Sequence, residues 1–225
     1  MIRGIGSSSD GKSQSIYAPR AEGQERALSE AYRQAGVAPE TVSLIEAHGT
    51  GTRVGDAVEL TALKRVFGAN GNSGRRCALG SVKSMIGHTK AAAGAAGLIK
   101  SALALYHKVL PPTLKADSPD PKLDLEASPF YLNTSTRPWF TPHADPRRCG
   151  VSSFGFGGSN FHLVLEEYRS EKAEIAWDAS VEILAFSGAT ADAVSDAVQA
   201  FKKTLDQTPA PQQLTRSART LRGRF

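Results

Sequence analysis

Residues 80–110 constrain the fold more than any other part of the chain. The segment opens with Gly-Ser-Val-Lys-Ser-Met-Ile-Gly-His-Thr-Lys, continues in alanine and glycine, and is followed by Pro111 and Pro112. Its second half carries apolar residues at helical spacing: Leu98, Ile99, Ala102, Leu103, Leu105 and Tyr106. We expect a helix that is capped by Thr89 and ends at the two prolines, because a proline nitrogen has no hydrogen to continue the ladder.

The first turns of this helix, residues 91–97, contain only alanine and glycine. Such a bare surface lets other backbones approach closely, so we expect a buried helix that is packed on every side. Lys83 and His88 precede the helix N-terminus, where the helix dipole favours negative charge. The pattern therefore indicates a site that handles negative charge, although it also fits a surface lysine and a capping histidine.

A second informative stretch, His48-Gly-Thr-Gly-Thr52, follows an expected strand over 42–47. Its glycines allow a ligand to approach the backbone, and Thr50 and Thr52 offer hydroxyl groups. Together with the lysine and histidine described above, the stretch places two imidazoles, an ammonium group and two hydroxyls on strand-to-helix loops. Sites of α/β proteins usually form on such loops.

The remaining pattern alternates between strands and helices. Asp56 and Glu59 have the spacing of a capping box, which predicts the start of a helix that ends at Gly68. The other expected elements are strands near 2–5, 77–82 and 130–133, a helix over 22–35, two strands joined by a glycine-dense turn over 149–164, a strand near 182–186, and a helix lined by Val194, Val198, Phe201 and Leu205. This alternation predicts an α/β fold.

Composition excludes several classes of protein. The positive charge is concentrated near the C-terminus in four arginines without interleaved aromatics, so we expect no nucleic-acid partner. No apolar run approaches the roughly 20 residues that span a bilayer, and the N-terminus lacks a signal core. Cys77 and Cys149 are the only cysteines, which favours a reducing compartment. We therefore expect a cytoplasmic protein that does not bind membranes.

Other catalytic and metal-binding patterns do not match the chain. The sequence lacks a Gly-x-Ser-x-Gly elbow, a Gly-x-Gly-x-x-Gly fingerprint and a Walker loop. The cysteines lack the paired spacing of a zinc site, so we expect no metal. We expect structural roles for the three other histidines, His107, His143 and His162.

Three motifs in this order resemble the C-terminal half of β-ketoacyl synthases, the decarboxylating condensing enzymes of fatty-acid and polyketide assembly. They are Glu46-Ala-His-Gly-Thr-Gly-Thr-Arg-Val-Gly-Asp56, then Gly80-Ser-Val-Lys-Ser-Met-Ile-Gly-His88 with the alanine–glycine run, and Gly150-Val-Ser-Ser-Phe-Gly-Phe-Gly-Gly-Ser-Asn160. Residues 131–139 and 159–168 look most like the synthases of large polyunsaturated-fatty-acid and polyketide assemblies.

The resemblance implies a fold and a domain organisation. Residues 1–168 would form the C-terminal half of a thiolase-like, layered α/β/α condensing-enzyme fold. Residues 169–225 would form a partial α/β linker toward a following acyltransferase region.

The resemblance also implies roles for individual residues. His48 and His88 would hold the malonyl thioester carbonyl while carbon dioxide leaves, and Lys83 would sustain the hydrogen-bond network around His88. Two preorganised N–H donors are a sound way to stabilise enolate charge. Substrate contacts would come from Thr50 and Thr52, which meet the phosphopantetheine arm, and from a gating phenylalanine with two glycines after it: Phe156, Gly157 and Gly158.

The partners follow from the same resemblance. No cofactor would bind directly, because the substrates travel on the phosphopantetheine of an acyl carrier protein. The family carries its nucleophilic cysteine in an N-terminal half that this sequence lacks, and the complete enzyme would be a dimer. We therefore expect an acyltransferase of the 3-oxoacyl synthase type whose activity needs that half, so that this chain alone is inactive. The alternative is a catalytically inactive fragment or an interaction module. The family's usual acidic partner for Lys83 lies on the alanine–glycine helix, where this chain has Gly97.

Overall fold

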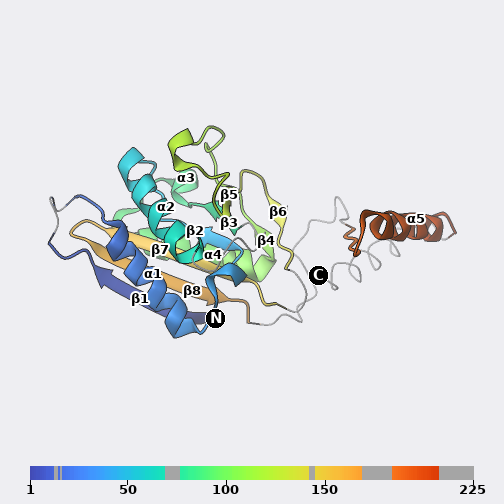
Figure 1. Ribbon diagram of the computed structural model, residues 1–225, viewed down its shortest axis with the longest axis horizontal. Coiled ribbons are helices and arrows are strands. Elements are labelled where there is room, and N and C mark those ends of the chain that lie inside the picture. The colour runs from blue at the N-terminus through green and yellow to red at the C-terminus, as the bar shows by residue number, and fades with distance from the viewer. Residues whose placement is uncertain (13–14, 16, 69–76, 142–144, 169–183, 208–225) are drawn as a thin grey trace. The chain divides into compact units, whose positions relative to one another are not determined.

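The computed structural model describes residues 1–12, 15, 17–68, 77–141, 145–168 and 184–207 (Figure 1). The chain divides into two compact units, Met1–Trp139 with Pro146–Tyr168, and Phe140–Asp145 with Arg169–Phe225. The first unit contains all of the predicted site residues. His143 and the C-terminal arginines lie outside the described residues.

The first unit is built on a six-stranded mixed sheet. In sheet order its strands are β1 (Ile2–Ser9), β8 (Ser159–Glu166), β7 (Arg148–Gly155), β2 (Leu44–Glu46), β3 (Cys77–Gly80) and β5 (Phe130–Leu132). The pairs β1–β8 and β8–β7 are antiparallel, whereas β7, β2, β3 and β5 run parallel. Two short strands, β4 (Val109–Leu110) and β6 (Arg137–Pro138), form a separate ribbon. The parallel strands bring the ends of β2 and β3 to one edge, where Glu46 lies opposite Gly80.

Helices cover both faces of this sheet, as the α/β pattern predicted. Helices α1 (Ala21–Ala35) and α2 (Arg53–Gly68) lie side by side on one face and α4 (Ala93–His107) packs on the other. Successive strand residues face opposite ways. Ile45 therefore joins the core under α1 and α2, while its neighbour Leu44 joins the core under α4. Four shorter helices complete the unit: η1 (Pro39–Thr41), α3 (Lys83–Ile86), η2 (Lys90–Ala92) and η3 (Pro121–Leu123).

Two predicted helix starts are wrong. Helix α2 begins at Arg53, three residues before Asp56, and the Thr52 hydroxyl accepts the N–H of Gly55 at 3.2 Å. Thr89 makes no capping hydrogen bond, and the chain after it forms the 3₁₀ turn η2 before α4 begins. Both differences arise because a local pattern does not determine which of several nearby acceptors a helix end uses.

Helix α4 is buried on one side only. Ala93, Gly97 and Ser101 face the sheet and are buried. The opposite side of the helix is apolar and exposed over Ala95, Ile99, Ala102, Leu103 and Tyr106. The expectation of a helix packed on every side is therefore wrong for this chain, because the sheet covers one side of α4 and no described element covers the other. No helix in the described part of the chain is long and apolar enough to cross a membrane.

The described part of the second unit contains α5 (Ala191–Gln207). The predicted helix is confirmed, and Val194, Val198 and Phe201 are half-buried along it. The rings of Phe186 and Phe201 lie 5.6 Å apart. Residues 184–186 do not form the predicted strand, and residues 182 and 183 lie outside the described part.

Candidate functional site

The two predicted histidines come together where β2 and β3 end. His48 follows β2 by two residues, and His88 follows the short helix α3 that continues from β3. Because the two strands are parallel neighbours, their C-terminal loops meet at one edge of the sheet. The ring centroids of His48 and His88 are 5.6 Å apart and their planes are nearly perpendicular, at 84°. The His48 ring also lies 5.7 Å from that of Phe154 on β7.

Both imidazoles are held in the neutral form at pH 7. Burial, together with the charges of Lys83 and His88, lowers the pKa of His48 to about 4. Desolvation and the positive charges of Lys83 and Lys90 also lower the pKa of His88. The Nδ1 atom of His88 accepts the backbone N–H of Lys90 at 3.1 Å, so the neutral ring carries its proton on Nε2. His88 therefore presents an N–H donor.

The His48 ring is less constrained by its neighbours. Its Nδ1 atom is buried and has no hydrogen-bond partner among the described residues. No described protein group therefore selects its tautomer, and a bound ligand is free to do so.

Lys83 lies at the start of α3 and is half-buried. Burial lowers the pKa of its ammonium group, and the negative charges of Glu59 and Glu46 act against that shift. Lys83 thus brings a positive charge next to the two histidines, and that charge disfavours their protonation.

Glu59 supports the histidine loop, a role that the sequence reasoning missed. Its carboxylate accepts the backbone N–H groups of His48 and Gly49 at 2.8 Å each, and its side chain is buried. The capping-box spacing predicted bonds to the start of its own helix. Glu59 instead reaches back to the preceding loop, because α2 starts a turn earlier and Thr52 serves its end. Burial raises the pKa of Glu59 to about 7, against the lowering effect of the two N–H donors.

The raised pKa of Glu59 predicts that the free energy of unfolding depends on pH. A carboxyl group with a folded pKa of about 7 and a reference pKa of 4.5 binds its proton more tightly in the folded state, so stability is lost as pH rises through this window. Relative to Glu59→Gln, which does not titrate, the native free energy of unfolding should fall by about 3 kcal/mol between pH 4.5 and 7. Denaturant unfolding at several pH values, at one protein concentration, measures this difference.

The exposed Glu126 supplies the control for that measurement. The curve of Glu126→Gln should run parallel to that of the native protein. Parallel curves for the native protein and Glu59→Gln would show that the Glu59 carboxyl does not hold its proton in the folded state.

The two predicted threonines lie on the same loop as His48. The hydroxyls of Thr50 and Thr52 are 3.0 Å apart. Gly49 and Gly51 adopt positive φ values of 46° and 72°, which side chains disfavour. A cavity of about 640 Å³ borders Thr50, Glu59 and Lys83 and extends beneath residues 113–125. The loop that carries His48 therefore also borders this half-open cavity.

Phe156 lies in the turn between β7 and β8, as predicted. Its side chain is 79% exposed and meets the edge of the Tyr17 ring at a centroid distance of 5.0 Å. Gly157 and Gly158 follow with φ values of 81° and 75°. The turn thus presents an aromatic side chain that few neighbours restrain.

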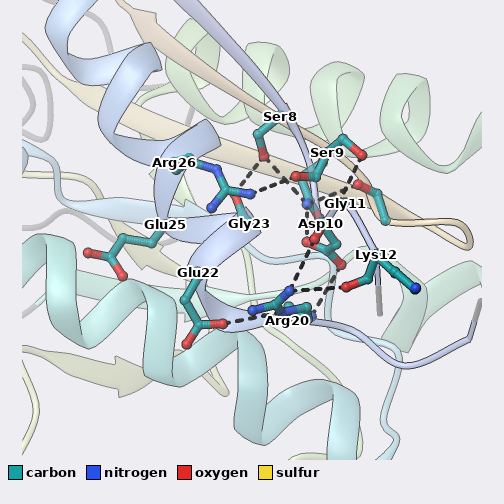
Figure 2. Close-up of polar contacts among 12 residues, drawn as sticks. Ser8, Ser9, Asp10, Gly11, Lys12, Arg20, Glu22, Gly23, Glu25 and Arg26 are labelled. Carbon is teal, nitrogen blue, oxygen red and sulfur yellow. Dashed lines mark hydrogen bonds and ion pairs between the residues drawn. The ribbon is translucent and has the colours of Figure 1, made fainter. Parts of the chain in front are cut away.

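Asp10 anchors this turn from the end of β1. The Asp10 N–H donates to the Gly158 carbonyl at 2.9 Å, and its buried carboxylate accepts from Asn160 Nδ2 at 2.8 Å. A Cβ on Gly158 would lie 2.5 Å from the Asp10 Cβ, so only glycine fits this approach. Figure 2 shows how Arg20 turns back onto the same segment: its guanidinium donates to the Asp10 carbonyl at 3.3 Å, and its N–H donates to the carboxylate at 3.2 Å. The Phe156 turn therefore has a fixed base and an unrestrained tip.

The remaining histidines and the cysteines lie in structural surroundings. His162 is fully buried between Ser152 Oγ at 3.0 Å and the Tyr32 hydroxyl at 3.2 Å, and burial lowers its pKa to about 3. His107 is the exposed last residue of α4. Cys77 and Cys149 are buried thiols, and burial raises the pKa of Cys149 to about 12. Among the described residues, no His, Cys, Asp and Glu side chains gather in a metal-binding group.

Comparison with known protein families gives two matches. A model described as "Beta-ketoacyl synthase, C-terminal domain" matches residues 1–117. A second, "Ketoacyl-synthetase C-terminal extension", matches residues 119–223.

Individual relatives agree with these matches. A polyunsaturated fatty acid synthase of Thraustochytrium sp. is 53% identical over 178 residues, which are 77% of this chain and 6% of that protein. Polyketide synthase PksL of Bacillus subtilis is 48% identical over 172 residues, 76% of this chain and 4% of that protein. The chain thus spans only a small fraction of the curated relatives that it matches.

A solved structure extends the likeness to the fold. The ketosynthase from module 6 of the bacillaene synthase of Bacillus subtilis superimposes with a TM-score of 0.72 and 40% identity, covering 93% of this chain and 36% of that one. The mixed sheet with helices on both faces is accordingly the thiolase-like arrangement of ketosynthases. The chain belongs to the β-ketoacyl synthase family and corresponds to its C-terminal domain.

Proposed function

We propose that this chain contributes the malonyl-binding side of a ketosynthase that joins malonyl and acyl thioesters in fatty-acid or polyketide assembly. The observation that carries the proposal is the pair of neutral imidazoles, His48 and His88, held face to edge 5.6 Å apart. The names of the relatives, a polyunsaturated fatty acid synthase and polyketide synthases, support the same reaction class.

The reaction needs N–H donors where negative charge develops. The bond between the malonyl carboxylate and its α-carbon breaks, carbon dioxide leaves, and the electron pair moves toward the thioester oxygen as an enolate. Neutral imidazole N–H groups on His48 and His88 would donate hydrogen bonds to that oxygen without transferring a proton to it. The enolate carbon then attacks the second acyl thioester, forms the carbon–carbon bond and expels its thiolate. Lys83 would keep the site positive while this charge forms.

Substrate binding is assigned to the two neighbouring loops. Thr50 and Thr52 would hydrogen-bond the phosphopantetheine arm through which an acyl carrier protein delivers the malonyl group. Phe156 would act as a gate, with Gly157 and Gly158 giving it room to move. A reducing compartment such as the cytoplasm suits a protein whose two cysteines are free thiols.

The acyl-accepting thiol has to come from another polypeptide segment. The sequence contains two cysteines, and both are buried with raised pKa values. Neither thiol is placed to reach a substrate held at the histidines, because each belongs to one of the two cores under the helices.

Reconstitution tests the proposal. The chain is mixed with the part of the module 6 bacillaene ketosynthase that it does not span, and carbon dioxide release from a malonyl group on an acyl carrier protein is measured. We expect release only when both parts are present. A stable complex that releases no carbon dioxide would favour an interaction module instead.

The proposed gating role of Phe156 can be tested separately in the reconstituted protein. Because the Phe156 side chain is largely exposed, Phe156→Ala should change the melting temperature little and alter which acyl chains are accepted. Competition between acyl thioesters of different length measures this preference.

Phe154 provides a matched control two residues away. It is buried on β7, the strand that leads into the Phe156 turn, and its replacement by alanine should destabilise the protein by about 3–5 kcal/mol. A large fall in melting temperature for Phe156→Ala, with acyl preference unchanged, would identify Phe156 as a core residue and remove the gating role.

A further inference from the structure

Glu46, the last residue of β2, connects three elements beneath the histidine pair. Its side chain is buried, with 2% of its surface exposed. One carboxylate oxygen accepts the backbone N–H of Val82 at 2.5 Å, and the other accepts from Lys100 Nζ on α4 at 2.7 Å. The carboxylate therefore links the strand before His48, the turn before Lys83 and the helix after His88.

Two glycines provide the space for this carboxylate and its partner. A Cβ on Gly97 would lie 3.1 Å from Glu46 Cγ and 3.7 Å from its carboxylate oxygen. A Cβ on Gly80 would lie 3.7 Å from Lys100 Nζ. Any larger residue in place of Gly97 on α4 would compete for the volume that the Glu46 side chain fills from β2.

The pair is not explained by stability alone. Burial raises the pKa of Glu46, so desolvation outweighs the attraction of Lys100 and the Val82 N–H. Buried ion pairs can often be replaced by apolar residues of similar volume with no loss of stability. Such a pair is better explained by the geometry that it imposes, which here is the spacing between the loops of His48 and Lys83.

We propose that Glu46 and Lys100 are positioning residues, which hold the Lys83 turn in register with the His48 loop through the Val82 N–H. The proposal rests on the proposed condensing function for its catalytic consequence. Its structural part, the dependence of the Val82 N–H on Glu46, holds independently of that function.

The first test removes the pair and keeps its volume. Glu46→Leu with Lys100→Met should leave the melting temperature within a few degrees of the native value. In the reconstituted protein, kcat for malonyl decarboxylation should fall at least about tenfold with KM unchanged, because binding groups are intact and alignment is lost. In the chain labelled with ¹⁵N-valine, the Val82 amide proton should lose the downfield shift of an N–H group that donates to a carboxylate.

A second buried ion pair in the same unit provides the control. Arg147 and Glu167 pair at 3.1 Å with side chains 7% and 4% exposed, away from both histidine loops. Arg147→Met with Glu167→Leu should leave kcat unchanged. An equal fall in kcat for both double variants would mean that any lost buried pair has this effect, which overturns the proposal.

The third test moves the carboxylate from β2 to α4. Glu46→Ala with Gly97→Glu places an acidic side chain within reach of the same Val82 N–H and Lys100. It should recover the Val82 shift and most of kcat. A folded variant that recovers neither would overturn the proposal, as would native kcat and a native Val82 shift in Glu46→Leu with Lys100→Met.

The two proposals fail in different ways. If the native reconstituted protein releases no carbon dioxide, the condensing function is wrong, and the Val82 shift still decides whether Glu46 and Lys100 position the turn.

Discussion

Replacing His48 or His88 with alanine is expected to lower malonyl decarboxylation in the reconstituted protein by about 10²–10³-fold, or about 3–4 kcal/mol in barrier. In the proposed mechanism, each substitution removes one N–H donor from the oxygen on which enolate charge would form. The two donors serve the same oxygen, so the double variant should lose less than the product of the two single losses. Release of carbon dioxide from malonyl carrier protein, measured without the acyl acceptor, isolates this step.

Acylation of the partner's thiol separates this role from general damage to the site. In the proposed reaction the acyl group loads before malonyl binds, so both histidine variants should still form the acyl-enzyme at near-native rates. His107→Ala supplies a matched control, because His107 is an exposed histidine at the far end of α4. Equal losses of acylation and decarboxylation in His48→Ala and His88→Ala would contradict the assignment.

The isolated 225-residue chain is expected to form no acyl-enzyme with acyl-coenzyme A. The thiolate is the reactive form of cysteine, and with a pKa of about 12 roughly 10⁻⁵ of the Cys149 thiol is ionised at pH 7. Cys77 is buried as well, and burial raises its pKa well above its ordinary value. Intact mass after incubation measures the adduct. A stable acyl group on either cysteine of a folded chain would contradict this account of the site.

The same isolated chain should self-associate or be poorly soluble. The outer side of α4 exposes 60% of Ile99, 52% of Leu103 and 61% of Tyr106 as one apolar strip beside bare alanines. Strips of this kind are rarely left open on soluble monomers. Ile99→Glu with Leu103→Glu should reduce light scattering without changing the fold, whereas monomeric behaviour of the native chain would show that this face needs no cover.

Local patterns predicted most of the helices and strands of the first unit and selected three residues that the structure brings together. The apolar spacing of residues 22–35 predicted α1 to within one residue, because period and glycine stop are properties of the segment itself. The site residues His48, Lys83 and His88 could be selected because each lies in a glycine-rich turn after an expected strand. The structure brings them together at one sheet edge, because β2 and β3 are parallel neighbours.

Tertiary structure alone decided which acidic groups serve the site. Glu59 has the local spacing of a helix cap, yet its carboxylate bonds to a loop ten and eleven residues away, because Thr52 takes the capping role. Glu46 meets Lys100 across 54 residues, and no local pattern relates the two. The alanine–glycine surface of α4 predicted packing on every side, but the described fold covers one side only, because such a surface can pack against one neighbour or two. In each case the sequence offers a polar or apolar group several possible partners, and only the packed fold determines which of them lies within reach.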